Sequence, residues 1–125
     1  MITFAVNTLP ECGRVNILFQ SDKDRKLYEV DKALQKRFGA TCAKKIRVRL
    51  DDLRDAADLV VMSKLGGRLH PITGDRAGQL SLDVEHPLRL LFVCVDEPLP
   101  TKDDGGLDWA RVRTVRIVGV EDTHG

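Results

Sequence analysis

One stretch, residues 68–92 (RLHPITGDRAGQLSLDVEHPLRLLF), constrains the fold more than any other part of the chain. From residue 80 to residue 85, apolar and polar residues alternate, and a period of two is typical of a strand with one buried and one solvent-exposed face. Gly74, Gly78 and Pro87 mark turns on either side of this segment. The stretch therefore predicts two or three antiparallel strands joined by short polar turns.

Residues 88–95, which follow Pro87, are apolar on both faces apart from Arg89. A strand with two apolar faces lies in the interior of a sheet, so we expect this strand to be central. An arginine in such a strand is partly removed from water and needs a partner. Arg89 is therefore a candidate functional residue.

The first half of the chain predicts a short strand at residues 15–20 and then two helices. Apolar residues recur at helical spacing from residue 27 to residue 38, with Ser21 or Asp22 as N-cap and Gly39 as the C-terminal stop. The first helix should therefore run over residues 22–38. A second set of apolar positions over residues 43–57, with Thr41 as a candidate cap, predicts another helix. The short link makes the two helices an antiparallel hairpin.

The remaining elements complete an α+β domain. Residues 58–64 predict a further helical turn, residues 98–106 a loop rich in Pro, Asp and Gly, and residues 112–120 a last strand. This order predicts an N-terminal helical hairpin packed on one face of an antiparallel β-sheet. We expect residues 15–125 to form this single domain. Residues 1–14, which have no clear period, are expected to form an irregular and dispensable extension.

The composition excludes several classes of protein. With 125 residues, of which 42% are hydrophobic, the chain can bury a core without disulfides or a metal. No apolar run approaches the roughly 20 residues of a membrane span, and the N-terminus lacks the pattern of a signal peptide. We therefore expect a cytoplasmic protein with no membrane partner. The three cysteines are widely spaced and odd in number, which favours reduced thiols over disulfides or a zinc site.

The net charge is only +1, but the charges are unevenly distributed. Residues 96–108 carry five carboxylates and one lysine, so the rest of the chain has an excess of positive charge that can attract phosphate locally. Basic residues crowd the first half of the second predicted helix and cannot all point inward. They form either a solvated helical face or, with Arg68, a patch that binds RNA phosphates. These helical residues are Lys44, Lys45, Arg47 and Arg49.

Motifs of most cofactor enzymes are missing, since the sequence has no G-x-G-x-x-G, P-loop, H-E-x-x-H, C-x-x-C or G-x-S-x-G pattern. We therefore expect no cofactor and no metal. Each remaining polar candidate, taken alone, has a structural explanation as an exposed turn residue, an ion-pair partner or a residue at the chain end. The candidates are His70, Asp75, Arg76, His86, Arg89, Asp122 and His124.

Taken together, these residue types are the ones that metal-free RNA cleavage requires. A base must take the proton from a ribose 2′-OH, a cation must hold the pentavalent phosphorane, and an acid must protonate the departing 5′-oxygen. Histidine suits both proton transfers near neutral pH, and the planar guanidinium of arginine suits the phosphorane. Which histidine acts as acid and which as base is left open.

Several motifs, in their length and order, resemble the RelE/ParE superfamily of toxin–antitoxin toxins, and most closely its HigB-like killer proteins. The similarity extends from Val15 to His124. It includes R-F-G at residues 37–39, L-H-P-I-T-G-D-R at residues 69–76, H-P-L-R-L-L-F at residues 86–92, D-G-G-L-D-W at residues 104–109 and E-D-T-H at residues 121–124.

This resemblance implies a RelE-like fold, in which helices flank a twisted antiparallel sheet whose concave face holds the active site. It implies a cognate antitoxin protein as partner. It also implies ribosome-dependent endoribonuclease cleavage of mRNA, without a metal or small-molecule cofactor. Residue by residue, His70 matches the family's catalytic histidine, Asp122 and His124 match its C-terminal acid and histidine, and Arg76 and Arg89 match its phosphate-holding arginines.

Three positions depart from the family pattern. Thr73 replaces a frequent lysine, and Leu88 and Thr123 replace frequent aromatic residues. The loss of an aromatic side chain removes a surface on which a base stacks, worth about 1–3 kcal/mol per base. These departures leave two alternatives open. One is a ParE-like, non-enzymatic inhibitor of a protein target such as DNA gyrase, and the other is a decayed toxin that only binds its antitoxin.

Overall fold

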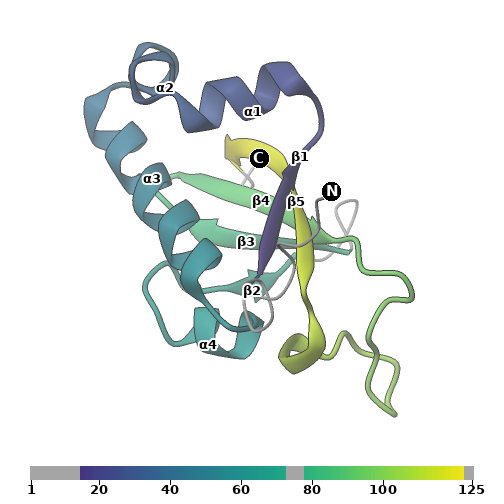
Figure 1. The fold of residues 1–125 in the computed structure, drawn as a ribbon. Helices are drawn as coiled ribbons and strands as arrows, with labels where there is room; N and C mark the ends of the chain where they lie inside the picture. The colour runs from purple at the N-terminus through teal and green to yellow at the C-terminus, as the bar shows by residue number, and fades with distance from the viewer. Residues whose placement is uncertain (1–14, 73–77, 123–125) are drawn as a thin grey trace.

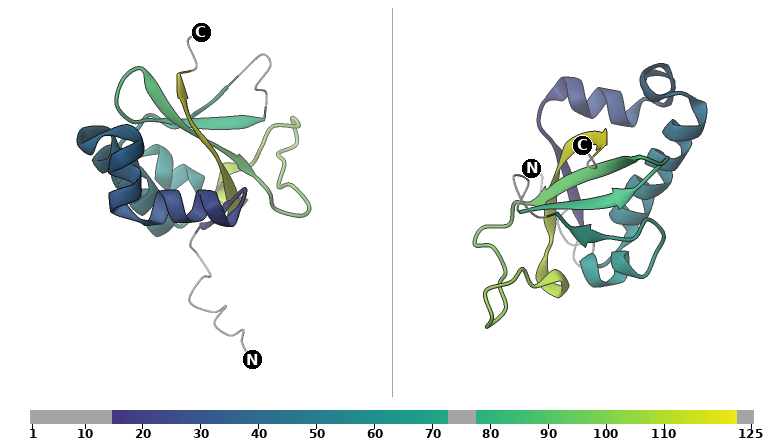
Figure 2. Two further views of the ribbon diagram at one scale, coloured as in Figure 1. Left: turned by 90° about the horizontal axis from the view of Figure 1, so that it is seen from above. Right: turned by 180° about the vertical axis from the view of Figure 1, so that it is seen from behind.

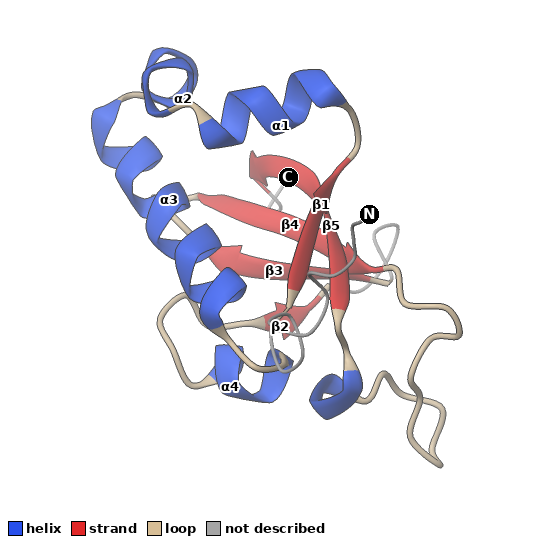
Figure 3. Ribbon diagram, viewed as in Figure 1, coloured by secondary structure: helices blue, strands red, loops and turns tan. Residues whose placement is uncertain are grey.

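The computed structural model describes residues 15–72 and 78–122, which form an α+β arrangement of helices on one side of a five-stranded sheet (Figures 1 and 3). Residues 1–14, 73–77 and 123–125 lie outside this description. The elements in chain order are β1 (Asn16–Phe19), α1 (Asp22–Glu29), α2 (Asp31–Phe38), α3 (Ala40–Asp55), α4 (Leu59–Ser63), β2 (His70–Pro71), β3 (Gln79–Asp83), β4 (Leu88–Cys94), the 3₁₀ helix η3 (Trp109–Arg111) and β5 (Thr114–Asp122).

The strand order of the sheet is β1-β5-β4-β3-β2, so β4 is the central strand, as its two apolar faces predict. The β2–β3, β3–β4 and β4–β5 pairs are antiparallel, which confirms three antiparallel strands in the 68–92 stretch. Strand β1, however, pairs with β5 in parallel at the edge. The sheet is therefore mixed, since β1 and β5 run in the same direction while every other neighbouring pair is antiparallel.

The first predicted helix is in fact two helices, because the chain breaks at Val30. This residue adopts an extended conformation, with φ −101° and ψ 109°, between the end of α1 and the start of α2. Val30 is β-branched and tolerates the extended conformation well. The two helices contact different elements. Tyr28 of α1 stacks on Phe19 of β1, with 5.7 Å between ring centroids, whereas Asp31 of α2 forms an ion pair with Arg47 of α3 at 2.8 Å.

Gly39 ends α2 and begins α3 in a single residue. Its φ of 86° lies in the left-handed region that glycine adopts without strain, so the chain reverses here without a longer loop. Helix α3 therefore starts at Ala40, and Thr41 lies inside it instead of capping it, contrary to the sequence prediction. The predicted N-cap at Ser21 is confirmed, since its side chain accepts from Asp24 N at 3.1 Å.

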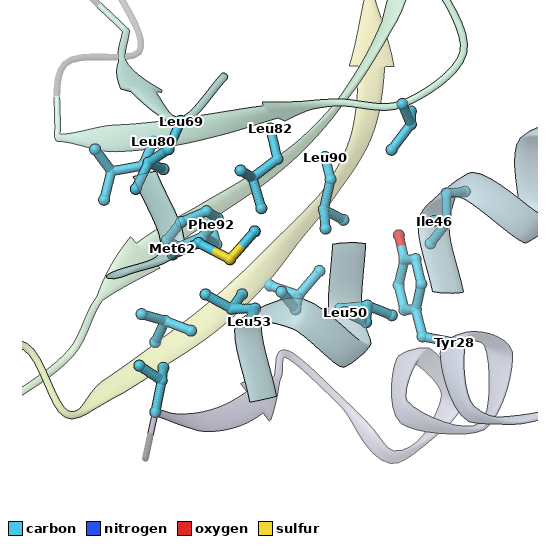
Figure 4. Close-up of a cluster of buried hydrophobic side chains, with 14 of the residues drawn as sticks. Tyr28, Ile46, Leu50, Leu53, Met62, Leu69, Leu80, Leu82, Leu90 and Phe92 are labelled. Atoms are coloured by element: carbon cyan, nitrogen blue, oxygen red, sulfur yellow. The ribbon is translucent and has the colours of Figure 1, made fainter. Parts of the chain in front are cut away.

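The hydrophobic core lies between the sheet and α3, with α1 and α4 closing its two ends (Figures 1 and 4). The inner sheet face contributes Leu80, Leu82, Leu90 and Phe92, all of which are buried. Facing them, α3 presents residues at three- and four-residue steps, as its sequence period predicts. These are Cys42, Ala43, Ile46, Leu50 and Leu53. Within the described ranges, none of the helices is long and apolar enough to cross a membrane.

The buried phenol of Tyr28 offers a test of this packing, since it is the single tyrosine of the chain. Burial, and then the charge of Asp24, raise its pKa from the usual 10.0 to about 12. The neutral phenol is thus favoured in the fold. Its contribution to stability is complete below pH 10 and is lost as the pH rises through about 12.

We expect the ultraviolet tyrosinate titration of the native protein to have a midpoint near 12, and that of the urea-unfolded chain to fall near 10. In the Tyr28→Phe variant, the alkaline loss of stability due to this group should disappear. A native midpoint equal to the unfolded one would contradict the burial of Tyr28 against Phe19 and the core.

Candidate functional site

The right-hand view of Figure 2 shows the sheet from the side opposite α3. On this face, the strand register brings two rows of residues together. Paired residues on neighbouring strands share a face, and residues two apart on one strand do so as well. One row is His70, Ser81, Leu91 and Gly119, from β2, β3, β4 and β5. The other row is Asp83, Arg89 and Glu121, from β3, β4 and β5.

His70 and Arg89 are in direct contact on this face. Arg89 Nη1 lies 3.0 Å from His70 Nε2, and His70 Nδ1 lies 3.0 Å from the carbonyl oxygen of Arg68. A guanidinium can only donate and a carbonyl can only accept, so Nε2 is the accepting nitrogen and Nδ1 carries the proton. The geometry therefore assigns a neutral imidazole in the Nδ1–H tautomer, with the fully buried Ser81 hydroxyl 3.5 Å from both ring nitrogens.

Arg89 also has the acidic partner that its place in the central strand requires. Asp83 lies directly opposite it on β3, and Arg89 Nε is 3.5 Å from Asp83 Oδ1. The second carboxylate oxygen of Asp83 accepts from Arg68 Nε at 2.6 Å. The side chains of Arg89 and Asp83 are only 16% and 28% exposed, whereas that of Arg68 is 76% exposed. Asp83 therefore links the exposed Arg68 to the inner Arg89.

Arg49, a predicted phosphate-binding residue, reaches the same site from α3 through a notch of two glycines. Its Nε donates to the carbonyl oxygen of Asp83 at 2.8 Å, and its side chain is 20% exposed. A Cβ at Gly66 would lie 2.7 Å from Arg49 Nη1, and one at Gly67 would lie 2.8 Å from its Cδ and Nε. The structure thus places Arg49 as a bridge between α3 and β3, not as an exposed cation.

The charges around Asp83 nearly balance. Three guanidinium groups, from Arg49, Arg68 and Arg89, meet the carboxylates of Asp83 and of Asp52, which lies 4.0 Å from Arg49. Glu121, opposite Arg89 on β5, is the third carboxylate around these three arginines, after Asp83 and Asp52. An RNA phosphate entering this site would compete with these carboxylates for the arginines, because the cations already have acidic partners.

The other basic residues of α3 differ in their exposure. Lys44 and Lys45 are exposed and line a depression of about 510 Å³ together with Val48 and Arg49. Arg47 lies on another side of the helix and forms the ion pair with Asp31. Of the four basic residues predicted on this helix, Lys44 and Lys45 are therefore the two that are exposed and form no ion pair with a residue in the described ranges.

The other predicted catalytic residues are Arg76, His124 and Asp122. Arg76 and His124 lie outside the described residues. Asp122 is exposed at the end of β5 and pairs with Leu88, whose side chain packs toward the core. Alternation along the strand therefore puts Glu121, and not Asp122, on the face of Arg89. Ser81, Asp83 and Glu121 were missed by the sequence analysis, although Ser81 and Asp83 belong to the alternating polar face that it identified.

A cavity of about 630 Å³ lies at the β2–β3 edge and is lined by Pro71 and Leu80, whose pairing puts them on the core face of the sheet, opposite the face of His70. Leu107, Trp109 and Val60 form its apolar wall. Trp109 also packs against the core, as predicted for a tryptophan that closes a core edge. The cavity is therefore separate from the face that carries His70 and Arg89.

Neither thiol in the described part of the chain is placed for nucleophilic chemistry. Cys42 is buried and Cys94 partly buried, and both are free. Burial raises the pKa of each thiol, so the reactive thiolate is disfavoured near neutral pH. Among the described residues, no group of three His, Cys, Asp or Glu side chains is arranged to hold a metal ion.

Comparison with known proteins yields similarity in structure only. The chain matches no protein-family model, and no curated protein matches it significantly. It is similar to the "YoeB-YefM complex from Staphylococcus aureus", with 18% identity, 86% of this chain and 95% of that chain covered, and a TM-score of 0.48. It is also similar to the "YoeB/ParE toxin from Agrobacterium tumefaciens", with 14% identity, 88% and 100% covered, and a TM-score of 0.46. At these identities, function has to be inferred from the chain's own residues.

The glycine notch gives a direct test of how Arg49 is held. Gly67→Ala puts a Cβ against Arg49 and a side chain at a φ of 100°, so it should cost both the backbone strain and the Arg49 hydrogen bond. Gly105→Ala is the matched control, since its φ is 89° and a Cβ there meets nothing within 4 Å. We expect urea unfolding to show about 1–2 kcal/mol of destabilisation for Gly105→Ala and about 2–4 kcal/mol for Gly67→Ala.

In an Arg49→Ala background, most of the excess cost of Gly67→Ala should vanish, because Arg49 is absent and only the contact of the new Cβ with Leu82 Cδ2 at 3.3 Å is left. Equal costs for the two glycine substitutions in the parent chain would contradict the bridging role of Arg49.

Proposed function

We propose that this chain is the toxin of a type II toxin–antitoxin pair of the RelE/ParE superfamily, an endoribonuclease that cleaves mRNA on the ribosome. The observation that carries the proposal is the contact of His70 Nε2 with Arg89 Nη1 at 3.0 Å, on the sheet face opposite α3. The pair combines a neutral imidazole with a guanidinium, which are the base and the cation that metal-free cleavage of RNA uses. Both residues lie in the motifs that resemble the superfamily.

In the proposed reaction, a phosphate of the mRNA draws the guanidinium of Arg89 away from His70. The lone pair of Nε2 is then free to accept the proton of the 2′-OH, which attacks the neighbouring phosphorus. Nδ1–H keeps its hydrogen bond to the Arg68 carbonyl, and this bond favours the imidazolium that forms. Arg89 holds the negative charge of the phosphorane. Asp122 or His124, near the C-terminus, is the acid that gives a proton to the departing 5′-oxygen in this proposal.

The proposed partners follow from this role. A cognate antitoxin would bind the chain and block the cleaving face, while the ribosome and mRNA would be its targets in the cytoplasm. Lys44 and Lys45 are proposed to contact ribosomal RNA, since they are the exposed cations on α3 next to the Arg49 bridge. The reaction is written without a metal or other cofactor, because the histidine and arginine supply the base and the cation.

Induced expression tests the proposal. We expect the chain to arrest growth and to produce cuts in translated mRNA, as seen by mapping 5′ ends. His70→Ala should lower the cleavage rate by about 10²–10⁴-fold, since it removes the general base. His124→Ala should lower it as well if this residue is the acid. His86→Ala, which changes an exposed histidine of the β3–β4 turn, is the control and should cleave normally.

Other outcomes have distinct meanings. Growth arrest without cuts, unaffected by both histidine substitutions, would contradict cleavage and favour an inhibitor of a protein target. No arrest at all would favour a decayed toxin that retains only antitoxin binding.

The proposed role of α3 predicts a salt effect. Lys44→Gln combined with Lys45→Gln should weaken ribosome binding, and the slope of log affinity against log salt should fall by about 1.4, for two lost phosphate contacts. Lys32→Gln with Lys36→Gln on α2 removes the same charge from another exposed surface and is the matched control. Equal slopes for the two double variants would exclude a specific α3 contact.

A further inference from the structure

Asp83 is held more rigidly than an ordinary residue at the end of a strand. Its amide donates to the carbonyl oxygen of Gly67 at 2.7 Å, and its own carbonyl accepts from Arg49 Nε at 2.8 Å. Its carboxylate oxygen Oδ2 accepts from Arg68 Nε at 2.6 Å, and Arg68 has a φ of 48°, which non-glycine residues seldom adopt. Backbone and side chain are thus fixed from three residues outside β3.

The other carboxylate oxygen faces the His70–Arg89 pair. Asp83 Oδ1 is buried and makes no hydrogen bond within the described part of the chain, but it lies 3.5 Å from Arg89 Nε. The guanidinium of Arg89 therefore has Nε on the Asp83 carboxylate and Nη1 on the imidazole of His70. A planar guanidinium held at one end turns its remaining donors in a defined direction.

We propose that Asp83 is a positioning residue, whose carboxylate orients the Arg89 guanidinium so that His70 stays in the Nδ1–H tautomer with Nε2 directed to Arg89 Nη1. Arg49, through the Asp83 carbonyl, secures that carboxylate from α3. The significance of this role for catalysis rests on the proposed function, whereas the tautomer itself can be measured without it. When phosphate replaces the imidazole at Nη1, Asp83 keeps Nε and prevents the guanidinium from leaving the site.

An ion pair that only stabilises the fold would behave differently. Its loss would lower the stability of the protein and leave the tautomer of the folded fraction unchanged. A positioning role predicts a change in the ring of His70 in a protein that is still folded. It also predicts opposite effects on substrate binding and turnover, because removal of the carboxylate frees Arg68 and Arg89 for phosphate while it loses the direction of Arg89.

Side-chain ¹⁵N NMR of the full chain at a pH where the imidazole is neutral tests the proposal, with the His70 signals assigned from their loss in His70→Asn. In the unsubstituted protein we expect a protonated Nδ1, the reverse of the tautomer that free histidine favours. Asp83→Asn should shift the ring toward Nε2–H, and Asp83→Glu should restore part of the Nδ1–H form. Asp51→Asn, which removes an exposed carboxylate paired with Arg54, is the control and should change nothing.

Two results would overturn the proposal: an Nε2–H ring in the unsubstituted protein, or a ring in Asp83→Asn identical to that in the parent. If Asp83→Asn does not fold, Arg68→Gln is the second variant, since it removes the Oδ2 contact from an exposed position. It should move the tautomer in the same direction by a smaller amount. An unchanged ring there would count equally against the positioning role.

Cleavage assays separate this proposal from the proposed function. Asp83→Asn should lower kcat by about 10- to 100-fold, the usual effect of losing a residue that orients a reacting group, without raising KM. A shifted tautomer in a chain that cleaves no RNA would refute the nuclease and leave the positioning role intact. Normal cleavage by Asp83→Asn, with an unchanged ring, would refute the positioning role and leave the nuclease intact.

Discussion

The site depends on one constraint, which is the presence of a guanidinium in the central strand of the sheet. Arg89 is only 16% exposed, and a charge so far removed from water has to be surrounded by groups that satisfy it. The register supplies Asp83 from one neighbouring strand and Glu121 from the other. His70, one strand further, accepts from Arg89 Nη1. The polar face is therefore the environment that Arg89 requires. Any chemistry at this face uses groups that already interact with Arg89.

The features of the fold that could be predicted from the sequence are those set by local patterns. The alternation over residues 80–85 and the double-sided apolar run over residues 88–95 gave three antiparallel strands with β4 at the centre. Gly39 and Ser21 marked helix boundaries through their own backbone and side-chain chemistry. What failed depended on distant contacts. The break at Val30 accompanies contacts of its neighbours with Phe19 and Arg47. The parallel pairing of β1 depends on the position of β5 in the sheet.

The candidate site divides in the same way. Residue type and position drew attention to His70 and Arg89, and a partner for Arg89 was expected. The identity of that partner was not predictable, because Asp83 occurs in a strand whose polar residues also suit solvent exposure. By sequence, Arg49 was grouped with its neighbours Lys44 and Lys45. Its side chain, however, is held against Gly66 and Gly67, which lie 17 and 18 residues further along the chain. Only the folded chain brings that notch to α3.

The balance of charge at Asp83 bears on how such a site would select its substrate. Arg49, Arg68 and Arg89 already face Asp52, Asp83 and Glu121. The binding free energy of an incoming phosphate is therefore small, because each new arginine–phosphate pair replaces an existing arginine–carboxylate pair. The missing aromatic residues remove stacking as a second source of affinity. We therefore expect free RNA to bind only weakly at this face. A substrate held by a separate surface, such as mRNA on a ribosome that also contacts Lys44 and Lys45, needs little affinity at the site itself. For the proposed nuclease, near-neutrality at this face favours action on RNA that a second surface presents to it.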